Sequence, residues 1–126
     1  QLRRGEVAVM QERERFGASH AEVGAYLLGL WGVPAVVAEA AAYYCCPTRH
    51  SSNSFSAVTA VHVACALEEA LADQPDGCPA PEDLKLDRSY LSSLSLEDRV
   101  PFWIDRCTET IRRHTQATGR DEQREA

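Results

Sequence analysis

Two long apolar segments constrain this chain more than any other feature. Residues 34–46 read PAVVAEAAAYYCC and residues 57–73 read AVTAVHVACALEEALAD, with few charges in either segment. Pro34 suits a first helical position, where its missing N–H has no helical partner to lose. Ser54 or Ser56 can cap the second segment. Helices that are apolar around most of their circumference need neighbours on most sides. The pattern therefore predicts a central helix over 34–46 that is buried on most sides, and a second strongly apolar helix over 57–73.

The rest of the chain also carries helical signals, and no segment shows the period-two alternation or the hairpin turn typical of β-strands. Ser19 and Glu22 form a capping box, a Gly-x-Pro sequence ends the helix that follows, and Asp87 can cap a short helix. Residues 117–126 carry little that could pack, and we predict a flexible tail there. We predict an all-α bundle of about five to six helices, with ranges 4–16, 20–31, 34–46, 57–73, a short segment after Asp87, and Pro101 to about Gln116.

The composition limits the class of protein. The 126 residues carry a formal net charge of −6, which disfavours nucleic acid as a partner because such binding uses a basic face. No apolar run reaches the length of a membrane span and no signal peptide is visible, so no membrane partner is expected. The five cysteines are an odd set and two of them are adjacent, which favours free thiols in a reducing compartment. We expect a cytoplasmic protein.

Two stretches in fixed order resemble the HDOD family. FGASHAEVGAYLLGLWGVPAVVAEAAAYYCCP is followed after a short loop by SFSAVTAVHVACALEEAL, and LDRSYLSSLSLEDRVPFW is similar to the family's C-terminal part. The resemblance covers residues 12–113 and rests on a His-x3-Gly helix, a WG-x-P stop and an HVA-x-AL helix. It implies an HD-domain-like bundle of helices. It also implies that residues 1–116 are the C-terminal portion of such a domain, taken from a longer protein.

The resemblance further implies where a metal site would lie. His20 falls where the related HD-GYP phosphodiesterases have a metal-ligand histidine. Tyr44 and Cys45 stand where these relatives have a histidine pair, and Cys65 stands where an aspartate is usual. The founding His-Asp pair would lie before residue 1. HDOD domains as a class are thought to have lost the catalytic metal set. The resemblance therefore implies no catalytic residue and no cofactor in this chain.

Cysteine and histidine could still supply a different metal site. His62 and Cys65 are three residues apart and share a helical face, and zinc accepts both ligand types. The spacing is not a recognised zinc pattern. In addition, adjacent cysteines on a helix point about 100° apart, so at most one of them faces a given ion comfortably. We predict no bound metal. The candidates that a zinc site would use are His20, Cys45, Cys65 and His62, with Cys46 and His50 nearby.

The favoured interpretation of function is a non-enzymatic signalling and interaction module of a bacterial signal-transduction protein, such as the output part of a response regulator in a two-component system. The alternative is an HD-superfamily metal-dependent phosphohydrolase or cyclic-di-GMP phosphodiesterase, although two-metal chemistry needs several carboxylate and imidazole ligands. A third possibility is a nucleotide-sensing pocket without turnover, for which Arg49 is the one cation near the cysteine-containing loop.

Protein partners are expected, including a second copy of this chain. The two apolar helices present more apolar surface than a short chain can cover, which predicts self-association, most simply as a two-fold dimer. Gly24 and Gly29 each cost the helix over 20–31 about 1 kcal/mol relative to alanine, so they predict close packing against its backbone. We predict that the dimer surface centres on Val36, Val37, Ala40, Ala41, Val61 and Val63.

Overall fold

The computed structural model describes residues 4–50, 54–74 and 77–125. Every regular element in these ranges is helical, which confirms the predicted all-α fold class. None of these helices is long and apolar enough to cross a membrane. The α-helices are α1 (Arg4–Phe16), α2 (His20–Leu30), α3 (Ala35–Tyr43), α4 (Ala57–Asp73), α5 (Arg88–Ser93) and α6 (Val100–Glu125), and short 3₁₀ turns lie at Pro47–Arg49, Pro81–Asp83 and Glu97–Arg99.

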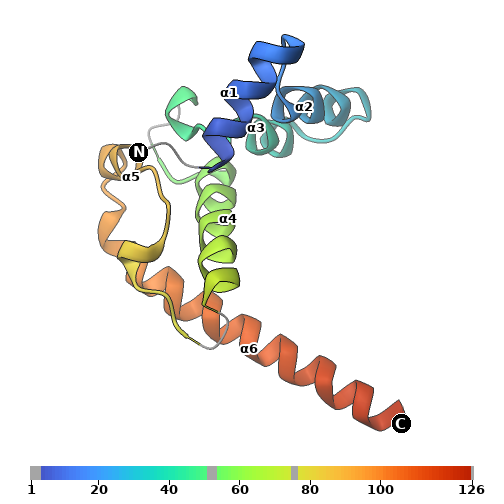
Figure 1. Ribbon diagram of the computed structural model, residues 1–126, viewed down its shortest axis with the longest axis vertical. Helices are drawn as coiled ribbons and strands as arrows, with labels where there is room; N and C mark the ends of the chain where they lie inside the picture. Colours follow the sequence, from blue (N-terminus) through green and yellow to red (C-terminus); the bar gives the residue numbers. More distant parts are fainter. Residues whose placement is uncertain (1–3, 51–53, 75–76, 126) are drawn as a thin grey trace.

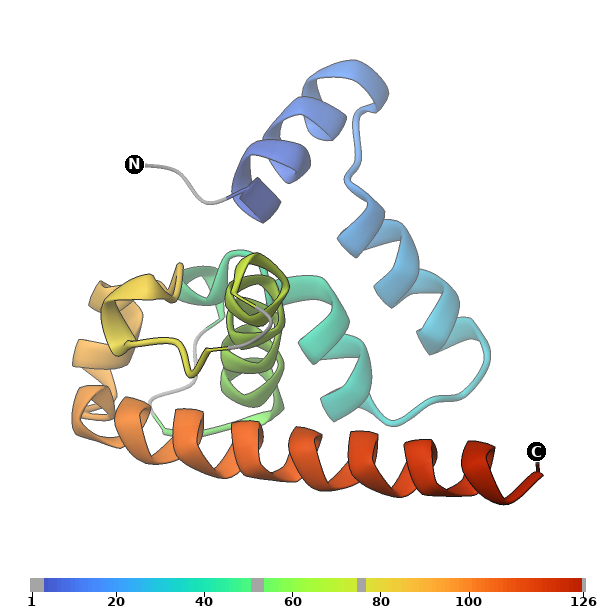
Figure 2. The same cartoon turned by 60° about the horizontal axis from the view of Figure 1, so that its bottom comes forward.

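Helix α4 is the centre of the arrangement. In both views it lies between α5 with the start of α6 on one side, and α2 with α3 on the other (Figure 1 and Figure 2). α1 lies above the α3 end of α4, and the C-terminal half of α6 projects away from the other helices in Figure 1. The result is an open arrangement in which α2 lies at the outer edge.

The main core lies on one side of α4. It joins this helix to α5, to the first turns of α6 and to the irregular segment before α5. Inside it, the Thr59 and Tyr90 hydroxyls are hydrogen-bonded at 2.7 Å. The predicted apolar helix over 57–73 is therefore present, and the structure makes it the central one. The buried members of the core are Val63, Ala66, Leu67, Ala70, Leu84, Leu86, Tyr90, Leu91, Val100 and Ile104.

The prediction that the helix over 34–46 is central and buried on most sides is wrong. Within α3 only Ala40 is buried, and Val36 and Val37 are exposed. α3 packs against α2 and α4, but its contacts with these two neighbours cover only part of its circumference. An apolar sequence shows that burial would be favourable, and it does not supply the neighbours that burial requires.

Helix α2 turns small residues toward the protein and large ones away from it. Ala21 is buried and Ala25 is half-buried. Gly24 and Gly29 do not mark a close helix crossing within the chain, because a Cβ added at either would meet no atom within 4 Å outside its own stretch of helix. The prediction that these glycines pack closely against another helix of this chain is therefore wrong.

The predicted helix ends are confirmed at several positions. The Ser19 hydroxyl accepts a hydrogen bond from the Glu22 N–H at 3.2 Å, which confirms the cap, whereas the Glu22 carboxylate pairs with Arg13. Ser56 is the N-cap residue that precedes α4. Gly17 and Gly32 have φ angles of 79° and 78°, the left-handed conformation in which a glycine commonly ends a helix. These local signals place the turns on both sides of α2.

Helix α6 is longer than predicted. It runs from Val100 to Glu125, past the predicted end near Gln116, so the separate tail over 117–126 is corrected to a continuation of the helix through residue 125. Ala126 lies outside the described residues. The stretch after Gln116 is rich in Arg, Glu and Gln, which are good helix formers. A polar sequence can therefore continue a helix even where it offers no apolar side chain for packing.

Candidate functional site

His20, the first residue of α2, links three helices. Its Nδ1 lies 2.8 Å from Glu12 Oε2, and its backbone N–H donates to the same oxygen at 2.6 Å. Its Nε2 lies 3.3 Å from the Tyr44 hydroxyl, just after α3. The hydrogen bond from the His20 backbone, followed by the one from its ring, lowers the pKa of the Glu12 carboxyl. His20 is therefore the junction between α1, α2 and the end of α3.

His62 is buried in α4, and the backbone occupies both of its ring nitrogens. Nδ1 lies 2.8 Å from the Tyr44 carbonyl oxygen, and Nε2 accepts a hydrogen bond from the Asp87 N–H at 3.0 Å. A carbonyl oxygen only accepts and an N–H only donates, so this pair of contacts requires a neutral ring with its proton on Nδ1. Asp87 is also the predicted cap of α5, since its carboxylate accepts from the Tyr90 N–H at 3.1 Å. His62 thus ties α4 to the end of α3 and to the start of α5.

Three of the predicted candidates meet around one small cavity. Cys45, His62 and Cys65 line a space of about 80 Å³ together with Tyr44. His62 and Cys65 reach it from the same face of α4, as their spacing predicts. A Cβ added at Gly5 would lie 3.2 Å from the Cys45 Sγ, so the start of α1 packs closely over this thiol. The remaining lining residues are Glu6, Ala66, Glu69 and Lys85.

Sequence analysis missed the charged rim of this cavity. Glu69 Oε1 lies 3.6 Å from Lys85 Nζ. Glu69 follows Cys65 by four residues on α4, and this spacing could have placed it on the same face. Lys85 lies in the irregular segment before α5, where no helical period applies. The cavity therefore combines thiols, an imidazole and an ion pair, and only the members on α4 have a periodic signal in the sequence.

A second cavity lies on the other side of Cys45. It measures about 130 Å³, and Arg13 and Arg49 both line it together with Cys46. The prediction that Arg49 is the one cation near the cysteine-containing loop is wrong, because Arg13 reaches the same cavity from α1. The Arg13 guanidinium is already paired with the Glu22 carboxylate, and this pairing lowers the pKa of Glu22.

Tyr44 and Cys65 hold their protons more strongly than usual. A hydrogen bond with the Cys45 side chain, followed by burial, raises the pKa of Tyr44 to about 12. Burial, followed by the nearby Glu68 carboxylate, raises the pKa of the Cys65 thiol. The thiolate, and not the thiol, is the nucleophile and the metal ligand. At neutral pH both side chains are therefore neutral hydrogen-bonding and packing groups.

The four metal candidates do not form one ligand set. His20 lies outside the cavity that Cys45, His62 and Cys65 line. His50 contacts a glutamate of α3 in a third place, at 3.3 Å. Within residues 4–50, 54–74 and 77–125, no three His, Cys, Asp or Glu side chains are placed to hold a metal ion. The groups that line the small cavity include two thiols, a neutral imidazole and a phenol.

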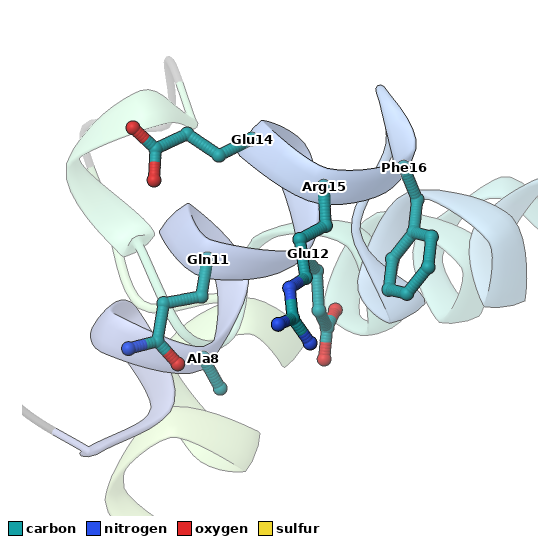
Figure 3. Close-up of a pocket in the computed structure, with 6 residues that line it drawn as sticks. All are labelled: Ala8, Gln11, Glu12, Glu14, Arg15 and Phe16. Atoms are coloured by element: carbon teal, nitrogen blue, oxygen red, sulfur yellow. The ribbon is translucent and has the colours of Figure 1, made fainter.

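A shallow hollow of about 440 Å³ runs along α1 itself. Glu12 and Arg15 point to the same side of the helix, whereas Glu14 points away from them (Figure 3). Glu12 is already bound to His20. A hollow formed by a single helix has no second wall that could position a ligand, so it is part of the open surface. Its lining residues are Ala8, Gln11, Glu12, Glu14, Arg15 and Phe16.

The predicted interaction surface lies only partly on the outside. Ala40 and Val63 are buried, with 6% and 7% of their surface exposed, so the prediction that they belong to a dimer surface is wrong. Val63 belongs to the core beside α5 and α6. The other four predicted residues remain accessible, since two are exposed and two are half-buried, namely Val36 and Val37, and Ala41 and Val61.

An apolar face that the helical spacing of the sequence predicts, on α2 and the residue that follows it, is exposed, which the sequence does not show. Its side chains recur at helical spacing, so the sequence shows that they share a face, and the fold leaves that face open. They are Val23, Tyr26, Leu27, Leu30 and Trp31.

No protein-family model, curated protein or solved structure matches this chain.

Proposed function

We propose that this chain is a non-enzymatic protein-interaction module of a bacterial signal-transduction protein. It would be the C-terminal portion of an HDOD-like domain and the output part of a response regulator. The observation that carries the proposal is the set of large apolar side chains that α2, α3 and the residue after α2 leave exposed, which we call the α2–α3 face. Its members are Val23, Tyr26, Leu27, Leu30, Trp31, Val36 and Val37, all of them exposed.

A face of this kind is typical of a protein-binding surface. Each of its seven side chains exposes between 41% and 74% of its surface. Single exposed apolar residues are ordinary on a soluble protein, whereas contiguous apolar patches beyond a few hundred Å² mark sites of interaction. Two of the seven are aromatic residues that also carry a polar group, a type enriched at the centres of interfaces. Binding to another protein would remove this surface from water.

The side chains at the expected ligand positions also favour a non-enzymatic role. His62 uses both ring nitrogens to hold the backbone of two other segments, so binding a metal through this ring would break part of the fold. Cys65 keeps its proton because burial and a neighbouring carboxylate raise its pKa. An HD-superfamily phosphohydrolase or cyclic-di-GMP phosphodiesterase needs several carboxylate and imidazole ligands that are free to coordinate two ions. The ring nitrogens of His62 are committed to hydrogen bonds with the backbone, and those of His20 contact Glu12 and Tyr44.

Photo-crosslinking tests the interaction role. A benzoylphenylalanine in place of Tyr26 lies on the α2–α3 face, and the same group in place of Phe102 lies on α6, where it is similarly exposed. In a bacterial lysate, we expect irradiation to link the chain to another polypeptide from position 26 and not from position 102. Equal yields from both positions, or no product from position 26, would contradict the proposal.

A hydrolysis assay tests the enzymatic alternative. The purified chain is supplied with Mn²⁺, Fe²⁺ or Zn²⁺ and offered bis-p-nitrophenyl phosphate or cyclic-di-GMP. We expect no turnover above that of the buffer. Turnover that disappears in the His20→Ala variant would favour the phosphohydrolase instead, because His20 stands where the relatives have a metal ligand.

A further inference from the structure

Helix α2 has its large apolar side chains on the side that the protein does not cover. Val23, Tyr26, Leu27, Leu30 and the adjoining Trp31 follow the i, i+3, i+4, i+7, i+8 spacing of one helical face, and all five are exposed. A face that runs straight along a helix for more than two turns has the shape that a second helix fits. The partner of this face is therefore expected to present a helix.

The area of the α2–α3 face matches one side of a standard protein interface. Its two aromatic side chains are 69% and 74% exposed and its five aliphatic ones between 41% and 64%. With aromatic side chains contributing about 150–250 Å² each and aliphatic ones about 60–120 Å² each, the open apolar area is roughly 400–650 Å². A standard interface buries about 800 Å² per partner, of which about 56–65% is apolar. The face is thus sufficient for one stable contact without further surface.

The charge distribution favours a second copy over a partner of opposite charge. No residue from Val23 to Trp31 is charged. The charged residues just before the face already have partners within the chain, since Glu22 pairs with Arg13 and His20 contacts Glu12. A charged partner would therefore find no opposite charge along this face. A second copy of the same face would bury no unpaired charge against it.

Helix polarity selects the direction of pairing. In a parallel pair the two N-termini of α2 would lie side by side, as would the two C-termini. In an antiparallel pair these ends lie apart, so like charges do not face each other. A two-fold axis perpendicular to α2 and passing near Leu27, the middle of the face, produces this arrangement.

Gly29 is consistent with a helix approaching from outside. It is exposed, and a Cβ added there would meet no atom of this chain within 4 Å. A glycine inside a helix lowers helix stability, and the fold of one chain gains no close contact in return. Beside a second α2, the missing side chain lets the two backbones come closer together.

We infer that two copies of this chain associate through α2, packed antiparallel about a two-fold axis near Leu27. This inference rests on the proposed interaction role and names its partner. It replaces the predicted dimer surface, whose centre on α3 and α4 includes two buried residues, by one centred on α2. Val36 and Val37 remain at its edge.

Sedimentation equilibrium on the full chain between 1 and 100 μM tests the inference. We expect the wild type to approach twice the 13.9 kDa of one chain, and to stay associated in 0.5 M NaCl because the contact is apolar. Leu27→Glu should raise the dissociation constant roughly 30-fold or more, the scale of an interface hot spot. Phe102→Glu, a control at an exposed apolar residue of α6, should leave association unchanged.

Mixing two variants tests the position of the axis. If Leu27 faces its own copy, Leu27→Glu and Leu27→Lys should each be monomeric alone and form a mixed dimer when combined. A wild type that is monomeric at 100 μM overturns the inference, as does a Leu27→Glu variant that dimerises like the wild type or a mixture that stays monomeric. The crosslinking test separates this failure from that of the proposed function, because a product with a different protein from position 26 would sustain the interaction role alone.

Discussion

Replacing His62 by leucine should destabilise the fold strongly. Leucine fills much of the same space but leaves the Tyr44 carbonyl oxygen and the Asp87 N–H, now 2.8 Å and 3.0 Å from the ring nitrogens, without their partner. An unsatisfied buried polar group costs about 1–3 kcal/mol, so the free energy of unfolding should fall by about 2–6 kcal/mol. Domains of this size are stable by about 5–15 kcal/mol, so a large part of the total would be lost.

Urea unfolding followed by circular dichroism at 222 nm measures this loss. With a urea dependence of about 1–3 kcal/mol per molar for small proteins, the unfolding midpoint of His62→Leu should fall by roughly 1–3 M. His62→Gln should recover part of the loss, because an amide can both donate and accept. The control is His20→Leu, which removes only exposed contacts and should shift the midpoint much less. A His62→Leu midpoint equal to that of the wild type would refute the hydrogen-bond assignment.

Four further outcomes are expected. In the Leu27→Glu background, which removes the inferred contact between copies, Gly29→Ala should raise the free energy of unfolding by about 0.5–1 kcal/mol in urea melts, because alanine favours the helix and its Cβ meets no atom outside its own stretch of helix. Cys65 should react with iodoacetamide at pH 8 more slowly than free cysteine, by mass spectrometry, and Glu68→Gln should speed it by removing a charge that raises its pKa. The pKa of Tyr44 is about 12 in the folded chain against an ordinary 10.0. The fold therefore favours the protonated phenol, and the stability that this preference contributes is fully present below pH 10 and is lost between pH 10 and 12. Alkaline urea melts should show this loss in the wild type and less of it in Tyr44→Phe. Removing residues 117–126 should leave the urea midpoint almost unchanged, because residues 109–117 of α6 are already exposed.

The local features of the fold could be predicted from the sequence because they depend on a few neighbouring residues. The Ser19 cap and the left-handed Gly17 and Gly32 follow from short-range hydrogen bonding and backbone freedom. The shared face of His62 and Cys65 follows from the helical period alone. None of these inferences requires knowledge of how the helices pack.

The errors concern contacts between helices. The apolar sequence of α3 does not reveal that its neighbours bury only Ala40, and the glycines of α2 do not reveal whether their open side faces this chain or another. The candidate site shows the same limit. Glu12 and Lys85 approach it from segments with no periodic relation to the histidines. A period identifies which residues share a face, and the partner of that face depends on tertiary structure.

A chain of contacts connects the exposed helix α2 to the core. His20, at the start of α2, contacts the Tyr44 hydroxyl at 3.3 Å, and the Tyr44 carbonyl lies 2.8 Å from the His62 ring. His62 in turn accepts from the Asp87 N–H, where α5 begins. The contact between His20 and Tyr44 is exposed, whereas those of His62 are partly or fully buried. The apolar face of α2 is therefore joined to the core through two histidines and the tyrosine between them.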